Sequence, residues 1–236
     1  AALSALMERS MLGIIGLICL TVPTAFAADK IVATKFFPAA QVHSIVAHTE
    51  AGRIAVTAAN GREAKVEAVK PADSEGHCEL ALDLKAGRLN LEARKPKGSS
   101  ALCDGGFTVT VPAEVTLEAY AGSGDIDIRG IKKTVKARAG SGSIALRDVR
   151  GQIYAMTGSG NIRASLASAA LDARSGSGNI TVSLSQASGL VSARSGSGDI
   201  EVFAPKGAKA RVKTQSASGR VVNEFPKRDQ APLLIE

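Results

Sequence analysis

The 236-residue sequence contains no tryptophan, and only 3% of its residues are aromatic. A core built on large rings is therefore excluded, although 45% of the residues are apolar. These proportions fit one domain with a thin aliphatic core, such as the narrow interior of a solenoid. The 24 glycines indicate many tight corners rather than many helices.

Long apolar runs are also missing, since the purely apolar or small stretch Met11–Val22 is too short to favour a transmembrane helix. The charged segment beginning at Met7 precedes this stretch, and an A-x-A cleavage pattern ending at Ala27 follows it. We therefore predict a signal peptide at residues 1–27, with an upstream extension before Met7, and one mature domain at residues 28–236. The mature chain would be periplasmic, on the cell surface or secreted, with no transmembrane segment. An uncleaved anchor is the alternative.

Cysteine and histidine are scarce, with three of each. Removal of the signal peptide leaves Cys78 and Cys103, which we expect to form a disulfide in an oxidising compartment. Two unpaired buried thiols are the alternative. His43 and His48 are five residues apart in a predicted strand and would point to opposite faces, as isolated surface side chains. We expect no metal site and no cofactor.

A Gly-Ser-Gly-like tetrad recurs six times in the second half of the chain. A near-constant period of this size is typical of a solenoid. The spacing between successive tetrads is 18 to 21 residues. The last glycines of the tetrads are Gly124, Gly142, Gly160, Gly178, Gly198 and Gly219.

Two alternating runs accompany each tetrad and predict two strands per coil. One run follows the tetrad and begins at an isoleucine, as at Ile126 and Ile144. The other precedes it and supplies one large residue per coil: Leu117, Val135, Ile153, Leu171, Val191 and Val212. Coils stacked about 4.8 Å apart would bury these columns. We predict an all-β, single-stranded β-helix with coils of 18–21 residues.

The N-terminal half alternates without a strict period, which predicts wider, irregular coils or a capping sheet continuous with the solenoid. Asn60–Gly61 and Ala86–Gly87 mark tight turns. The expected strands are residues 42–46, 54–56, 64–69, 80–84, 89–93 and 107–111.

The tetrads themselves predict tight corners in which one or more residues adopt positive φ. Asx residues follow four of them and would satisfy backbone groups of the turns as a ladder, at Asp125, Asn161, Asn179 and Asp199. Ser143 and Arg220 interrupt this ladder. Since the interrupted column lacks an acidic residue in every coil, it disfavours the calcium sites of nonapeptide β-rolls.

The tetrads, together with the strand that leads into them, resemble a known family. That strand contains Val111-Pro112-Ala113-Glu114-Val115-Thr116-Leu117. The sequence is similar to the bacterial putative-adhesin family of exported β-strand-repeat proteins, a domain of unknown function with GSGDI-type repeats. The similarity spans Val42 to Val222. It implies a single-stranded β-helix and offers no catalytic residues to transfer.

The net charge of +7 is unchanged by signal removal, because Glu8 and Arg9 cancel. A basic exported protein would meet anionic polysaccharide, lipopolysaccharide or another envelope component, and we expect no specific nucleic acid. Arg138, Arg174 and Arg194 occupy equivalent positions in their coils and predict an outward column that grips phosphate or carboxylate groups. Arg129, Arg147, Arg150 and Arg163 lie on neighbouring turns and strands. A solvated face is the alternative for this column.

Carbohydrate-active enzymes also use β-helices, so a polysaccharide lyase or glycosidase is the alternative function. The paired carboxylates Asp125/Asp127 and Asp199/Glu201 would lie four coils apart, about 19 Å. Glycosidase carboxylates are roughly 5 to 10 Å apart, so the two pairs could not act on one bond. We therefore predict a non-enzymatic adhesin or envelope-binding scaffold.

Overall fold

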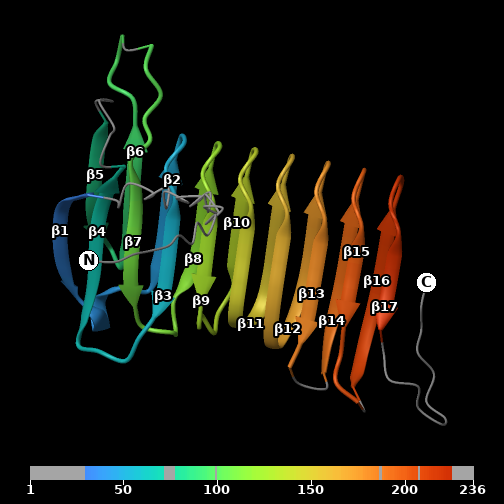
Figure 1. Ribbon diagram of the computed structural model, residues 1–236. Helices are drawn as coiled ribbons and strands as arrows, with labels where there is room; N and C mark the ends of the chain where they lie inside the picture. Colours follow the sequence, from blue (N-terminus) through green and yellow to red (C-terminus); the bar gives the residue numbers. More distant parts are fainter. Residues whose placement is uncertain (1–29, 72–77, 99, 186–187, 207, 225–236) are drawn as a thin grey trace, which may run out of the picture.

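The computed structural model describes residues 30–71, 78–98, 100–185, 188–206 and 208–224, and these form a flattened β-solenoid (Figure 1). Within these ranges, 17 strands belong to one continuous sheet, and the helical structure is a single 3-10 turn, η1 (Ala39–Gln41). The fold is the predicted β-solenoid. The predicted signal peptide lies outside the described residues.

The sheet wraps into two faces that enclose one apolar core. Face A consists, in spatial order, of β5 (Glu79–Lys85), β6 (Arg88–Arg94), β2 (Ser44–Thr49), β8 (Thr116–Ala121), β10 (Val135–Ala139), the second part of β11 (Ile144–Thr157), the second part of β12 (Ile162–Ser175), β14 (Ser188–Ser195) and β16 (Lys209–Ser216). Because β11 and β12 run around the side of the solenoid, each contributes to both faces.

Face B contains the remaining strands. In spatial order these are β1 (Lys30–Pro38), β4 (Glu63–Lys70), β7 (Gly106–Val111), β3 (Ile54–Ala58), β9 (Ile126–Arg129), the first parts of β11 and β12, β13 (Ile180–Leu184), β15 (Ile200–Phe203) and β17 (Val221–Glu224).

The coils from β8 onward stack in parallel and in the predicted register. Leu117 pairs with Val135, and the column continues through the remaining large residues to Val212. These side chains are at most 2% exposed. Each buried aliphatic side chain contributes about 1.5–3 kcal/mol of transfer free energy, and this contribution depends on the neighbouring coils.

The N-terminal half does not stack in chain order. The coil made by β2 and β3 lies between β6 and β7 on one side and β8 and β9 on the other. In Figure 1 the blue β2 accordingly lies between the green β6 and the yellow-green β8. The expected irregularity is therefore one regular coil in a displaced position, next to antiparallel strands.

Antiparallel pairing closes this end of the solenoid. β4 pairs antiparallel with β7 and β1 with β4, while β5 and β6 form a hairpin. The tight turn predicted at Ala86–Gly87 is confirmed, because both residues have positive φ and join paired strands. The tight turn predicted at Asn60–Gly61 is wrong: β3 and β4 both pair with β7, so their connection crosses the end of that strand.

The tetrad glycines do not adopt positive φ, so this part of the sequence prediction is wrong. A Cβ atom at Gly142, Gly160 or Gly178 would overlap the carbonyl oxygen of the last tetrad glycine in the preceding coil. Backbone therefore stacks directly on backbone along this edge. Gly52 continues the column between Gly105 and Gly124, which independently places the β2–β3 coil.

The predicted Asx ladder runs beside this glycine column. The Asp125 carboxylate accepts a hydrogen bond from the Ser143 amide N–H at 2.8 Å, and Asn161 and Asn179 repeat the contact one coil further on. Ser143 continues the ladder, because its hydroxyl accepts from the Asn161 N–H at 3.4 Å. Arg220 closes it by donating its amide N–H to Asp199. The ladder thus satisfies turn backbone groups, which leaves these side chains engaged in the fold.

The structure joins Cys78 and Cys103 in a disulfide, with Cα atoms 5.2 Å apart. Cys103 is fully buried, and its carbonyl accepts a hydrogen bond from the Ala51 N–H in the turn between β2 and β3. The bridge thus connects the start of the β5–β6 hairpin to the displaced coil.

Candidate functional site

The outward arginine column occupies face A, in the predicted register. Tyr120 pairs with Arg138, then Met156, Arg174, Arg194 and Gln215 follow on successive strands. On the other side of Tyr120 the column is extended by His48 of the displaced β2 strand. We call this set column C.

A second outward column, which the sequence analysis did not single out, runs parallel to it two residues earlier on each strand. We call this set column B: Glu118, Lys136, Tyr154, Asp172, Ser192 and Lys213. The same alignment of coils contained the signal for column B. Its residue types differ from strand to strand, so no repeated residue type marked the column in the sequence.

The two columns enclose a shallow surface hollow of about 360 Å³ over β10, β11 and β12. Its lining consists of Lys136, Arg138, Tyr154, Ala155, Met156, Asp172 and Arg174. Tyr154 and Met156 form its exposed centre, with 44% and 42% of their surfaces accessible. Three cationic side chains and one carboxylate therefore surround an apolar centre.

Asp172 organises the C-terminal side of the hollow. Its two carboxylate oxygens accept hydrogen bonds from Nε and an Nη of Arg174, at 3.1 and 2.7 Å. Arg194 lies 3.8 Å from the same carboxylate. Asp172 raises the pKa of Arg174 through this hydrogen bond and its charge. Two members of the predicted arginine column are consequently tied to one acidic residue, which reduces their joint positive charge.

Arg138 has different surroundings on the N-terminal side. Its guanidinium lies 5.9 Å from the ring centre of Tyr120, over the face of the ring. The other side of Tyr120 stacks against His48, with ring centres 4.6 Å apart. The interpretation of His48 as an isolated surface histidine is therefore wrong.

Glu118 connects this aromatic stack to Lys136. Its carboxylate accepts hydrogen bonds from Lys136 Nζ at 2.9 Å and from the Tyr120 hydroxyl at 3.1 Å. The hydrogen bond from Lys136 lowers the pKa of Glu118, and the same contact raises the pKa of Lys136. Partial burial, followed by the contact with Glu118, raises the pKa of Tyr120. Lys136 thus stays protonated at the rim of the hollow.

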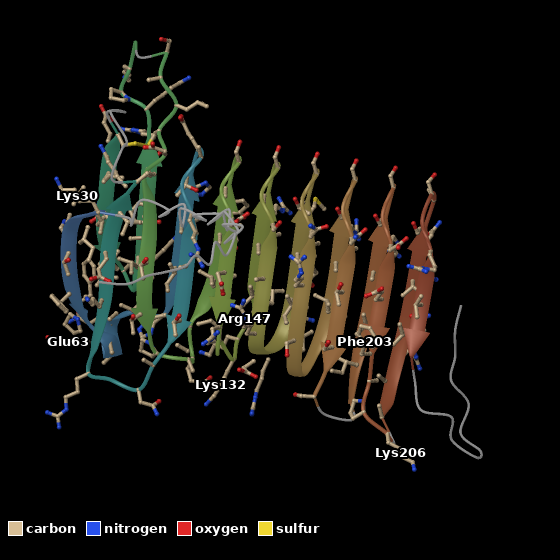
Figure 2. All side chains as sticks on the ribbon, viewed as in Figure 1. Lys30, Glu63, Lys132, Arg147, Phe203 and Lys206 are labelled. Atoms are coloured by element: carbon tan, nitrogen blue, oxygen red, sulfur yellow. A yellow bond between two sulfur atoms is a disulfide. The ribbon has the colours of Figure 1, made fainter. Side chains whose placement is uncertain are left out.

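Arg129, Arg147 and Arg163, which the sequence placed near the column, do not join this surface. Arg129 and Arg147 pair on adjacent strands of face B, and Arg163 is on the same face. Figure 2 shows Arg147 and Lys132 at the strand ends opposite the glycine-rich turns. The grouping of these arginines with the column on face A, expected from the sequence, is therefore wrong.

Three of the four carboxylates considered for catalysis, Asp125, Asp127 and Asp199, have partners within the fold. Asp127 accepts two hydrogen bonds from Arg147, at 2.8 and 2.9 Å, and also contacts Arg53. Asp125 and Asp199 belong to the turn ladder, four coils apart. At about 4.8 Å per coil this is about 19 Å, too far for a glycosidase pair.

The described part of the chain contains no group of three or more His, Cys, Asp or Glu side chains that could hold a metal ion. Within the same ranges, no helix has the length and apolar character needed to cross a membrane.

Solved structures that this chain is similar to include proteins of three bacteria. A putative cell adhesion protein from Clostridium sporogenes is 13% identical, with a TM-score of 0.49, and the match covers 84% of this chain and all of that one. A putative adhesin from Bacteroides fragilis is 16% identical, with a TM-score of 0.48 and coverage of 84% and 99%. A putative lipid binding protein from Parabacteroides distasonis is 13% identical, with a TM-score of 0.36 and coverage of 83% and 96%.

No curated protein matches this chain. The sequence model of the family described as Toastrack DUF4097 matches residues 37–231, which include both columns, the glycine turns and the antiparallel end except most of β1. The chain therefore belongs to the Toastrack DUF4097 family.

Proposed function

We propose that this protein is an exported, non-enzymatic scaffold that binds an anionic polymer of the cell envelope through columns B and C of face A. The observation that carries the proposal is the hollow over β10–β12, where Lys136, Arg138 and Arg174 surround an exposed aromatic and apolar centre. An extended polymer would lie along the solenoid, because the columns repeat every coil, about 4.8 Å apart.

The charge distribution supports an anionic partner. The hollow has three cations and one carboxylate, and the whole chain has a net charge of +7. Guanidinium groups bind carboxylate, sulfate and phosphate groups with paired N–H donors, so acidic polysaccharide and lipopolysaccharide both fit. Attraction of this kind is screened by salt over about 10 Å at 0.1 M ionic strength.

Export is part of the proposal and rests on the sequence at residues 1–27 together with the two mature cysteines. The non-enzymatic role rests on the engagement of Asp125, Asp127 and Asp199 in ion pairs and turns. Polysaccharide turnover by purified protein, lost in Asp125→Asn or Asp199→Asn, would contradict it.

Binding to an anionic polysaccharide such as heparin tests the proposal. The triple variant Arg138→Gln, Arg174→Gln and Arg194→Gln should bind about tenfold more weakly, taking roughly 0.5 kcal/mol for each exposed charge. The salt dependence of binding should also become shallower, because fewer charges contribute.

A matched control removes three arginines elsewhere: Arg129→Gln, Arg150→Gln and Arg163→Gln. This variant has the same net charge as the first but leaves face A intact. Equal loss of binding by both variants would reveal a nonspecific charge effect and would refute a site on face A.

A further inference from the structure

We infer that the hollow over β10–β12 binds a single acidic sugar ring, with its apolar face on Tyr154 and its hydroxyl groups on Asp172. This inference rests on the proposed function and specifies its ligand as an acidic saccharide rather than polyanions in general. It is carried by the order of the side chains across the hollow.

The lining forms a grid of three strands by two columns. Column B presents Lys136, Tyr154 and Asp172 on successive strands, and column C presents Arg138, Met156 and Arg174 opposite them. The three strands span about 10 Å, since neighbours are about 4.8 Å apart. This width accommodates one pyranose ring with its substituents.

The centre of the grid is apolar and accessible. Tyr154 is 44% exposed and Met156 is 42% exposed, whereas the inward residues Ile153, Ala155 and Thr157 of the same strand are buried. An exposed aromatic ring offers a flat apolar surface next to a polar hydroxyl. The carbon-bound hydrogens on one face of a sugar ring match such a surface, whereas a fully charged chain such as polyglutamate has no comparable flat group.

Asp172 distinguishes a sugar from other polyanions. A carboxylate within the site repels phosphate, sulfate and carboxylate groups, and it therefore opposes binding of a simple polyanion. Its oxygens have about four acceptor positions, and Arg174 occupies one on each oxygen. The others can accept hydrogen bonds from neighbouring hydroxyl groups, which sugars supply. Arg174 holds the carboxylate in a fixed orientation for this contact.

The opposite side of the grid provides the cations. Lys136 donates one of its three N–H groups to Glu118 and retains two. Arg138 rests on the Tyr120 ring and contacts no carboxylate within 4.0 Å among the described residues. The acidic group of the sugar would therefore lie over Lys136 and Arg138, and its hydroxyl groups would lie over Asp172.

Isothermal titration with two probes tests the inference: an oligomer of galacturonic acid and polyglutamate of similar charge. Tyr154→Ala should weaken binding of the uronic acid oligomer about tenfold, because the flat apolar contact is lost, and should change polyglutamate binding less than about twofold. Phe203→Ala is the matched control, because Phe203 is an outward aromatic residue of face B (Figure 2). It should affect neither probe.

Asp172→Asn gives the sharper result, because the expected effects have opposite signs. Loss of the carboxylate should weaken binding of the uronic acid oligomer and strengthen binding of polyglutamate, since a repulsive charge is removed. Circular dichroism should show an unchanged fold for each variant, because all the substituted side chains are at the surface.

The outcomes separate the two proposals. Binding of both probes that is insensitive to Tyr154→Ala, or strengthened equally by Asp172→Asn, would overturn the sugar site and leave the polyanion-binding face in place. A wild-type protein that binds neither probe would overturn both.

Discussion

In the C-terminal half each coil pairs with the coil that follows it in the sequence, whereas the N-terminal half places β2 and β3 beside strands that come much later. The C-terminal coils repeat one set of contacts: a glycine column, an Asx ladder and a column of large aliphatic residues. The N-terminal half uses antiparallel strands and a disulfide.

The two halves differ because one forms an end of the stack and the other forms most of its interior. A stack of parallel coils leaves open strand edges at its ends, and such edges can pair with other chains. Antiparallel strands and the β5–β6 hairpin cover the N-terminal end, where the strand pairing does not repeat from coil to coil. In the interior of the stack one repeated set of contacts is enough to stabilise each coil, because every coil has the same kind of neighbour on both sides.

The largest effect is expected from Gly160→Ala, which tests the repetitive half. The new Cβ atom would lie 2.0 Å from the Gly142 carbonyl oxygen, so the coils would have to separate. We expect a loss of more than about 4 kcal/mol in the free energy of unfolding, measured by urea denaturation. Gly61→Ala, in the connection between β3 and β4 where the nearest atom to a new Cβ is 3.6 Å away, is the control. Similar stability of the two variants would refute the role of backbone stacking.

Removal of the disulfide tests the irregular half. The double variant Cys78→Ala and Cys103→Ala opens a link between residues 25 apart in the sequence and should cost about 3 kcal/mol. Hydrogen exchange should show the loss of protection in β2, β3 and β5–β7, with β12–β14 little changed. Reduced wild-type protein should behave like the double variant. An exchange pattern that changes uniformly would contradict the division into two regions.

Ser175→Ala should have a smaller effect and tests a detail of the repetitive coils. The buried Ser175 hydroxyl donates to the Gly160 carbonyl at 2.9 Å and accepts from the Gly178 N–H at 2.8 Å. Its removal leaves both backbone groups without this partner, at a cost of about 2 kcal/mol in thermal or urea unfolding. Ser177→Ala in the same turn changes an exposed side chain and should be nearly neutral. Equal effects would show that the buried hydroxyl contributes nothing specific.

The smallest effect concerns Glu118 on β8, where the two regions meet. Lys136 lowers the pKa of Glu118 in the folded protein below its ordinary value of 4.5. The stabilisation is therefore fully present above pH 4.5 and is lost as the pH falls through the folded pKa. Because the side chain is 35% exposed, solvent screening limits the effect to less than about 1 kcal/mol.

The difference in unfolding free energy between wild type and Glu118→Gln, measured from pH 7 to pH 3, checks this prediction. It should shrink as the pH falls, because protonated Glu118 resembles glutamine. Parallel curves for the two proteins would show that the ion pair does not contribute.

Much of the fold was predictable because the repeat is short. The spacing of the tetrads placed Leu117, Val135 and the later large residues in one buried column, and Arg138, Arg174 and Arg194 in one outward column. The strands of the N-terminal half were also predicted, except β1, whose side chains are mostly exposed. Their pairing was not predictable, since alternation indicates a strand but not its neighbour.

The candidate site was predictable only in part. The coil alignment located column C, and the same alignment contained column B. The stacking of His48 on Tyr120 depends on β2 lying next to β8, and no local pattern connects residues so far apart. The role of the tetrad glycines was misjudged for a similar reason, because the atom that excludes a Cβ belongs to another coil.

The sequence by itself determined the coil length, the alternation of inward and outward side chains, and the register of the C-terminal coils. Each follows from periodicity, and a period of two within strands and 18–21 between turns leaves one arrangement that buries the aliphatic residues. Tertiary structure alone decided the position of the β2–β3 coil, the antiparallel end and the ion pairs that shape the hollow. These depend on contacts between segments distant in sequence, and their formation requires the whole chain to fold.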